Sequence, residues 1–261
     1  MNLLVCVKFV PDTEEVRTGA DHTLVRDARS QKLNPADESA LEAALRLAGP
    51  EGAVTVLTMG APFCQTPLGE LLARGARRAV LLTDKALAGS DSLATARALA
   101  AAAARLGPFD AILCGRRALD GETGQVPPEL AAHLDIPCVT NATQVRRAEA
   151  HLMCARLLEE EEQTLAVQLP AVVSLCEYAY PLRAPSLAGY RRARQTPVEV
   201  LAAGDLGLAP EACGLAGSPT RVRHIAPQTA GRRQVRRLPL DGAAEVLARL
   251  VAQAGGKGAG A

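Results

Sequence analysis

The sequence contains no tryptophan and only three phenylalanines and three tyrosines among its 261 residues. RNA-binding modules stack bases on exposed aromatic rings, so this scarcity argues against that class of protein. The apolar residues, 48% of the chain, must then build a core mainly from Ala, Leu and Val. Such a core suits helices that pack closely on a parallel β-sheet.

Long apolar runs and a strong charge of either sign are also absent. The formal net charge is +1 at pH 7, which gives the chain as a whole no attraction to nucleic acids or membranes. No apolar run approaches the roughly 20 residues that cross a bilayer. Lys8 and Pro11 interrupt the short apolar start, where a signal peptide needs a continuous run. We therefore expect a cytoplasmic protein with no nucleic-acid partner and no membrane insertion.

Metal-binding and nucleophile motifs are missing as well. The seven cysteines include no C-x-x-C pair, and the four histidines lack the spacing of metal ligands. Neither a nucleophile–base arrangement, nor G-x-x-x-x-G-K-S/T, nor G-x-G-x-x-G after the first strand occurs. We therefore predict no catalytic side chains and no metal, and we favour redox chemistry carried by a bound cofactor. A stand-alone ATP-using α/β enzyme stays an alternative.

Predicted strands alternate with predicted helices through the first half of the chain. Apolar runs that end in turn residues predict strands at 2–9, 53–58, 79–83 and 110–114. Helices are predicted at 35–48, with Asn34 as the N-cap, at 64–73, at 90–106, and from Pro127 to about residue 134. Residues 16–25 suggest a small hairpin excursion. This alternation predicts an α/β fold with a doubly wound, mainly parallel sheet.

In the second half of the chain, the predicted strands follow one another without helices between them. Runs at 139–147, 151–158 and 163–169 predict an antiparallel hairpin extension beside the parallel sheet, and 170–175 predicts one more buried strand. From residue 177 onward we expect irregular structure until a final amphipathic helix at 241–254.

Arginines collect in an extended arm before that helix. Between residues 212 and 240 there is no acidic residue, and the arginines there are Arg221, Arg223, Arg232, Arg233, Arg236 and Arg237. The arm is too poor in apolar residues to form its own core. It is either an interface for a partner or anionic ligand, or a solvated basic surface.

The segment 115–126 is the most distinctive loop at a predicted strand end, which is where ligands bind in doubly wound sheets. It reads G-R-R-A-L-D-G-E-T-G-Q-V. Its glycines allow close approach of backbone to a ligand, and Arg116 or Arg117 could balance phosphate charge. Pro127 and Pro128 have no N–H, so main-chain phosphate contacts must come from residues 121–126. A glycine-rich turn without a ligand is the structural alternative.

Several segments together resemble the electron-transfer flavoprotein β subunit family. They are residues 4–13 (L-V-C-V-K-F-V-P-D-T), 34–47 (N-P-A-D-E-S-A-L-E-A-A-L-R-L), 111–134, 170–173 and 182–200. The resemblance implies a Rossmann-like domain paired with an α subunit that holds the electron-shuttling FAD. It implies that the β subunit binds AMP or a second FAD.

The same resemblance implies the residues that contact the cofactor. They are Cys6, Val7, Lys8, Asn34, Pro35, Ala36, Asp37, Met59, Gly60, Gly115, Arg116, Arg117, Ala118, Leu119, Asp120, Gly121, Glu122, Thr123, Gly124, Gln125 and Val126.

The segment 120–125 is similar to that of flavin-bifurcating members, which favours FAD over AMP as the cofactor. In those members NADH reduces the β-subunit FAD. One electron then passes to ferredoxin or flavodoxin, and the other to the α-subunit FAD. The alternative is a β subunit that binds only AMP, as a structural nucleotide.

Residues 182–194 resemble the family's recognition loop, in which Leu187 would insert into an acyl-CoA dehydrogenase-type or quinone-reducing partner. The domain expectation follows from the family pattern. Residues 1–205 form the nucleotide- or flavin-binding domain, and 206–261 form an arm and helix that contact the α subunit.

Overall fold

The computed structural model describes residues 1–12, 31–159, 161–223 and 240–255. The chain divides into two compact units, Met1–Arg223 and His224–Ala261. The excursion expected at 16–25 and four of the arginines of the arm, which fall within 224–239, lie outside the described residues. The domain boundary expected at 205/206 stays a prediction, whereas the first compact unit extends to Arg223.

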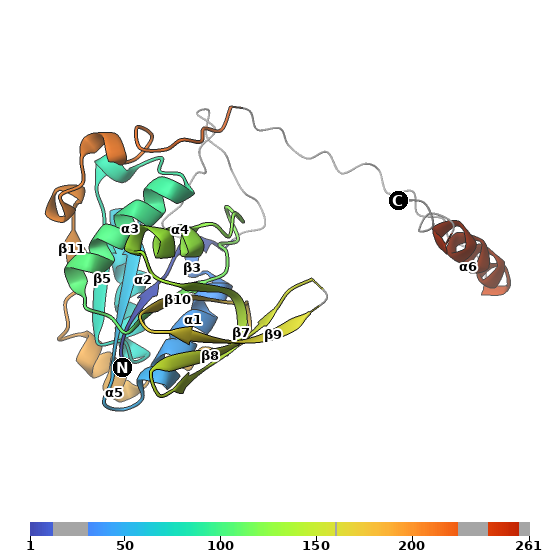
Figure 1. Cartoon of the computed structure of the whole chain (residues 1–261), viewed down its shortest axis with the longest axis horizontal. Coiled ribbons are helices and arrows are strands. Elements are labelled where there is room, and N and C mark those ends of the chain that lie inside the picture. The colour runs from blue at the N-terminus through green and yellow to red at the C-terminus, as the bar shows by residue number, and fades with distance from the viewer. Residues whose placement is uncertain (13–30, 160, 224–239, 256–261) are drawn as a thin grey trace. The chain divides into compact units, whose positions relative to one another are not determined.

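Within the described residues of the first unit, nine strands form one sheet in the order β11-β5-β4-β1-β6-β10-β7-β8-β9 (Figure 1). Neighbours from β11 to β7 run parallel, and β7, β8 and β9 continue the sheet as antiparallel hairpins. The strands are β1 Asn2–Cys6, β4 Ala53–Met59, β5 Arg78–Leu82, β6 Ala111–Gly115, β7 Cys138–Ala148, β8 His151–Leu157, β9 Glu162–Gln168, β10 Ala171–Leu175 and β11 Glu199–Leu201.

Helices cover both faces of this sheet. Helices α1 (Pro35–Ala48) and α2 (Gln65–Ala73) pack into one apolar core, and α3 (Ser92–Leu106) and α4 (Val126–Leu134) pack into the other. Strand β1 shows the alternation behind this arrangement, because Leu3 and Val5 face the first core and Leu4 faces the second. The predicted α/β, doubly wound, mainly parallel architecture with a hairpin extension is confirmed.

Two of the helix starts follow from local residues. Asp91 caps α3, since its Oδ1 accepts the N–H of Ala94 at 3.0 Å. Pro127 and Pro128 occupy the first turn of α4, where their missing N–H groups cost no helical hydrogen bond. This is the helix start that the sequence predicted.

Two regions differ from the sequence prediction. The single strand expected at 2–9 breaks, because β1 ends at Cys6 and β2 (Phe9–Pro11) pairs instead with β3 (Gln31–Leu33) in a separate antiparallel ladder. The stretch expected to be irregular after residue 177 contains helix α5 (Leu187–Ala193) and the edge strand β11. Both elements are short, and tertiary contacts hold them: Arg78 of β5 binds Glu199 of β11 at 2.6 Å.

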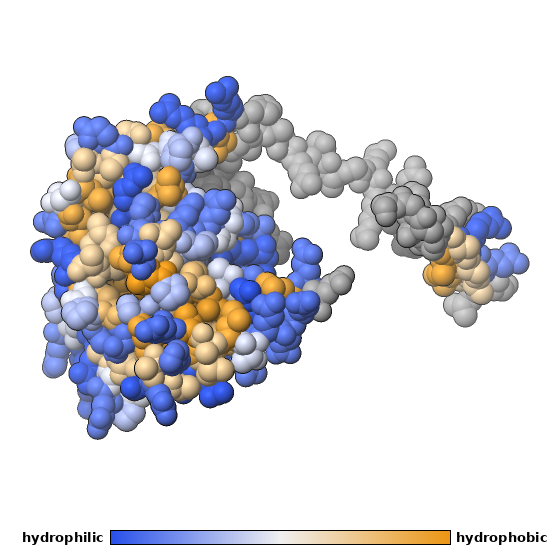
Figure 2. Space-filling model, viewed as in Figure 1, coloured by the Kyte–Doolittle hydropathy of each residue, from blue (hydrophilic) through white to orange (hydrophobic). Residues whose placement is uncertain are grey.

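The second unit contributes helix α6, Leu240–Gly255, which confirms the helix predicted at 241–254. In Figure 2 this helix shows apolar side chains (orange) apart from hydrophilic ones (blue). The large apolar residues exposed on it are Leu247, Leu250 and Val251. Among the helices in the described parts of the chain, none combines the length and the apolar character that a membrane crossing requires.

Candidate functional site

The residues predicted to contact the cofactor all lie at the carboxyl edge of the parallel strands. Cys6 ends β1, Met59 ends β4 and Gly115 ends β6, while Val7, Lys8 and Gly60 directly follow their strands. Pro35, Ala36 and Asp37 form the first turn of α1, residues 116–125 form the loop after β6, and Val126 begins α4. We refer to 115–125 as the glycine loop.

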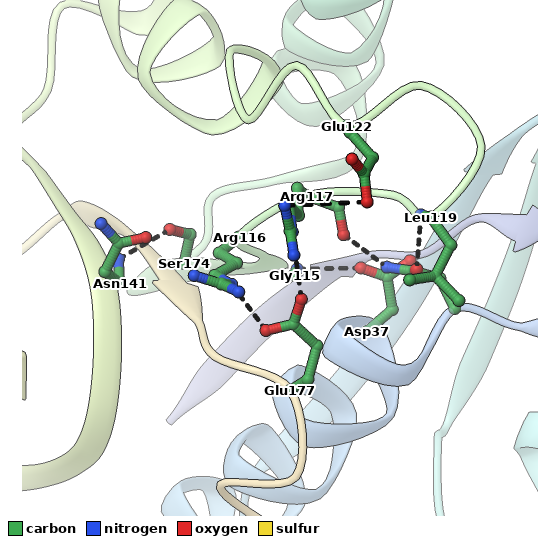
Figure 3. Close-up of polar contacts among 10 residues, drawn as sticks. Asp37, Gly115, Arg116, Arg117, Leu119, Glu122, Asn141, Ser174 and Glu177 are labelled. Atoms are coloured by element: carbon green, nitrogen blue, oxygen red, sulfur yellow. Dashed lines mark hydrogen bonds and ion pairs between the residues drawn. The ribbon is translucent and has the colours of Figure 1, made fainter. Parts of the chain in front are cut away.

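Asp37 is a buried carboxylate that joins the ends of two neighbouring strands. Its Oδ2 accepts the N–H of Lys8 at 2.7 Å. Its Oδ1 accepts the N–H of Gly115 at 2.9 Å, as Figure 3 shows. Burial raises the pKa of Asp37 to about 7, against the lowering effect of these hydrogen bonds and one from the Asn34 side chain. Asp37 therefore fixes the start of the glycine loop relative to β1.

We predict that Asp37 makes the free energy of unfolding depend on pH, and that Asp37→Asn removes this contribution. Since the pKa is about 7 in the folded protein and 3.8 for an ordinary aspartate, the stability contributed by the protonated form is lost progressively as the pH rises from about 4 to 7. Relative to Asp37→Asn, the wild-type free energy of unfolding should fall by about 1.4 kcal/mol per pH unit between pH 5 and 7. Urea unfolding at pH 5, 6, 7 and 8 measures this. A constant difference between the two proteins would contradict it.

The side chain of Asn34 bonds the glycine loop and not the helix that it precedes. It occupies the N-cap position of α1, but its side chain makes no capping hydrogen bond. Its Nδ2 donates instead to the carbonyl of Arg117 at 2.9 Å, and its Oδ1 accepts the N–H of Leu119 at 3.2 Å. Asn34 is therefore the N-cap residue that the sequence predicted, but two main-chain groups of the loop take its side-chain amide in place of the helix N–H groups.

Lys8 fixes the middle of the glycine loop. Its Nζ lies 2.7 Å from Oδ1 of Asp120, whose side chain is only 4% exposed. Glu122 then turns the chain, since its N–H donates to the carbonyl of Ala118 at 2.8 Å and its φ is 50°. Side chains from the connection between β1 and β2 and from the start of α1 thus hold the loop.

The two arginines of the loop share one carboxylate. Nε of Arg116 donates to Oε2 of Glu177 at 2.6 Å, and Nε of Arg117 donates to Oε1 at 3.3 Å (Figure 3). Burial alone would raise the pKa of Glu177, but hydrogen bonds from Arg116 and Arg117 hold it below its ordinary value. Glu177 was not predicted from the sequence. The available signal was an acid two residues after a buried strand.

Main-chain donors are available where α4 begins. The N–H groups of Gly121, Thr123, Gly124 and Val126 have no hydrogen-bond acceptor among the residues that the structure describes. The start of α3 lies beside them, because Ser92 Oγ donates to Oε1 of Gln125 at 3.0 Å. Two helix N-termini and their partial positive charges therefore meet at this edge, which suits phosphate groups.

The predicted residues do not share one cavity. Lys8, Met59 and Gly60 line a small pocket with Phe9 and Cys64, among others. A second pocket of about 290 Å³ is lined by part of the glycine loop (Arg116, Arg117, Glu122, Thr123 and Gly124) and by Thr140, Asn141 and Ser174, which sequence reasoning missed. This volume is at the lower end of the roughly 300–1,000 Å³ of small-molecule sites. In the described ranges, no group of three or more His, Cys, Asp and Glu side chains is placed to hold a metal ion.

Leu187 lies away from the glycine loop, at the start of α5, and is 83% exposed. The expected recognition loop is partly helical there, because Ser186 Oγ accepts the N–H of Gly189 and caps α5 at 2.9 Å. Arg183, earlier in the segment, binds buried Glu42 of α1 through Nε and Nη2 at 2.9 and 3.0 Å. An exposed leucine is thus held on an anchored segment.

Comparison with known proteins identifies relatives over most of the chain. The electron transfer flavoprotein domain model matches residues 21–206. Electron transfer flavoprotein subunit beta of Thermoanaerobacterium thermosaccharolyticum is 41% identical over 225 residues, 85% of this chain and 86% of that protein. The caffeyl-CoA reductase-Etf complex subunit CarD of Acetobacterium woodii is 39% identical over 238 residues, 88% and 90% of the two chains. Protein FixA of Rhizobium meliloti is 38% identical over 248 residues, 91% and 85%.

Proposed function

This chain belongs to the electron transfer flavoprotein family as a β subunit, and we propose that it binds FAD at the carboxyl edge of its sheet and exchanges electrons with an α-subunit FAD. The single observation that carries the FAD site is the glycine loop. It is fixed by Lys8, Asn34 and Asp37, and it presents unused main-chain donors at the start of α4.

The residues present fit a cofactor with a diphosphate. The N–H groups of Gly121, Thr123, Gly124 and Val126 would bind phosphate oxygens, and the N-terminal ends of α3 and α4 would stabilise the negative charge. Because Asn34, Asp37 and Lys8 already hold the loop, little conformational entropy is lost on binding. When bound, FAD supplies the redox chemistry, and the side chains of this chain bind it and orient it.

We extend the proposal to the route of the electrons. NADH would be the donor, and the acceptors would be the α-subunit FAD and a low-potential carrier such as ferredoxin or flavodoxin. The similarity of 120–125 to flavin-bifurcating members supports this version. A β subunit that binds AMP as a structural nucleotide is the second candidate, because the main-chain donors of the loop suit the phosphate of AMP equally well.

Counting cofactors decides between the two candidates. We predict that the heterodimer, purified after co-expression with its α subunit, contains two FAD and no AMP. Absorbance of the released flavin and chromatography of the released nucleotides measure both quantities. One FAD and one AMP per heterodimer would support the structural-nucleotide candidate and overturn FAD binding at this site.

Two exposed apolar features support a proposal for how partners dock. The apolar residues of α6, Leu247, Leu250 and Val251, are spaced to lie along one side of a helix, and we propose that this side contacts the α subunit. Leu187 on α5 would insert into an acyl-CoA dehydrogenase-type or quinone-reducing partner.

A further inference from the structure

Tyr178 has an unusual backbone conformation for a large side chain. Its φ is 62°, in the left-handed region that favours glycine and asparagine. Among the described residues other than glycine, it is the only aromatic one with a positive φ. Packing of the side chain does not offset this cost, since the residue is 80% exposed. Backbone strain of this kind is concentrated at functional sites.

Contacts on both sides of Tyr178 hold it in this conformation. The carboxylate of Glu177 accepts the Nε–H of Arg116 at 2.6 Å (Figure 3). On the other side, the hydroxyl of Tyr180 accepts the N–H of Val145 at 2.9 Å. Glycine or asparagine at position 178 would adopt the same turn at a lower cost, so the turn alone does not account for a tyrosine. What the tyrosine adds is an exposed ring on a fixed backbone beside the glycine loop.

The position of Tyr178 continues the row of predicted cofactor contacts along the carboxyl edge of the sheet. Those contacts lie at the ends of β4, β1 and β6, and β10 is the next strand in the order. Tyr178 lies three residues after the end of β10, where Leu175 pairs with Gly115 of β6. Since neighbouring strands are about 4.8 Å apart, a cofactor that reaches from β4 to β6 needs only one further step to reach Tyr178.

FAD would extend farther from the start of α4 than AMP does. A diphosphate bound there would have one half of the dinucleotide on the side of β1 and β4 and the other half on the side of β10. AMP has a single half, for which the contacts predicted after β1 and β4 are sufficient. The flavin half must stay within reach of the α-subunit FAD to exchange electrons, and the exposed ring of Tyr178 stands on the side that is left for it.

We propose that Tyr178 stacks on the isoalloxazine ring of FAD and thereby selects FAD over AMP, an inference that rests on the proposed function. A tyrosine ring offers a large, rigid face to another aromatic ring system, and offset stacking of the two is favourable. Because Glu177 and Tyr180 already hold the backbone, binding orders only the two side-chain torsions of Tyr178.

Tyr178→Gly tests the proposal without unfolding the site. Glycine adopts a φ of 62° more readily than tyrosine, so the variant keeps the turn, loses the ring and should not lower the Tm. Tyr178→Phe keeps the ring and removes only the hydroxyl. Glu149→Gly is the matched control, since Glu149 also has a positive φ (52°) but belongs to the turn between β7 and β8. FAD and AMP are titrated calorimetrically into heterodimers whose β-subunit nucleotide has been removed by dialysis.

We expect Tyr178→Gly to weaken FAD binding roughly tenfold and to leave AMP binding unchanged. Tyr178→Phe and Glu149→Gly should bind both nucleotides as the wild type does. Equal FAD affinity in the wild type and Tyr178→Gly would overturn this inference and leave the proposed function standing.

Two other results would also overturn it. An equal loss of FAD and AMP affinity would mean that the ring does not distinguish the two nucleotides. Weaker association with the α subunit at unchanged FAD affinity would make Tyr178 an interface residue instead. A wild-type heterodimer that binds AMP but no second FAD would refute the proposed function itself, and this inference with it.

Discussion

Replacing Gly115 with alanine should destabilise the chain by about 3 kcal/mol and empty the proposed cofactor site. A Cβ at this position would overlap Asp37 Oδ1 and lie 2.8 Å from the Cβ of Ala36. Neither neighbour can move freely, because Asp37 is buried and Ala36 is in the first turn of α1. The alanine would push the end of β6 away from α1 and break the hydrogen bond from Gly115 N–H to Asp37. The start of the glycine loop would then no longer be held in place by Asp37.

Thermal unfolding and flavin content measure this result together. A loss of about 3 kcal/mol corresponds to a fall in Tm of roughly 10 °C for a chain of this size. Gly121→Ala is the control for the substitution itself, since a Cβ there meets nothing within 4 Å. It should change the stability by less than about 0.5 kcal/mol. If Gly115→Ala unfolds at the wild-type temperature, the close packing of Asp37 against β6 is wrong.

Local signals in the sequence were sufficient for most of the fold. The strands of a parallel sheet covered on both faces are continuous apolar runs, and β4, β5 and β6 are of that kind. Asp91 and the Pro127-Pro128 pair mark two of the helix starts. In contrast, α5 and β11 are short and stabilised by distant residues, such as Arg78 for β11, so local patterns did not reveal them.

The candidate site was predictable only where its residues are close in sequence. The glycine loop follows directly from a buried strand and three glycines. Glu177 could not be found in this way, because its place depends on the strand order. Strand β10 lies between β6 and β7, and Leu175 pairs with Gly115, which brings Glu177 beside Arg116. The hydrogen bonds of the Asn34 side chain could not be foreseen for the same reason, since its partners Arg117 and Leu119 are more than 80 residues away.

Replacing Gly121 with valine should empty the proposed cofactor site while the fold remains intact. The position is open, because a Cβ at Gly121 has no atom within 4 Å, and its φ lies outside the left-handed region. The N–H of Gly121 is one of the unused donors at the start of α4. Two methyl groups beside these donors would keep phosphate oxygens at a distance at which hydrogen bonds no longer form. We expect cofactor affinity to fall at least about tenfold, with a change in unfolding free energy below about 0.5 kcal/mol.

Valine at another open glycine, outside the proposed cofactor site, is the control for this substitution. Gly204, in the short helix Ala203–Leu206, is also open to solvent, with nothing within 4 Å of a Cβ. The heterodimer with Gly204→Val should keep two FAD, whereas Gly121→Val should keep only the FAD of the α subunit. If AMP is the bound nucleotide, Gly121→Val should release AMP and leave the flavin content unchanged. Full occupancy by either nucleotide in Gly121→Val would mean that the phosphates do not bind the main chain at the start of α4.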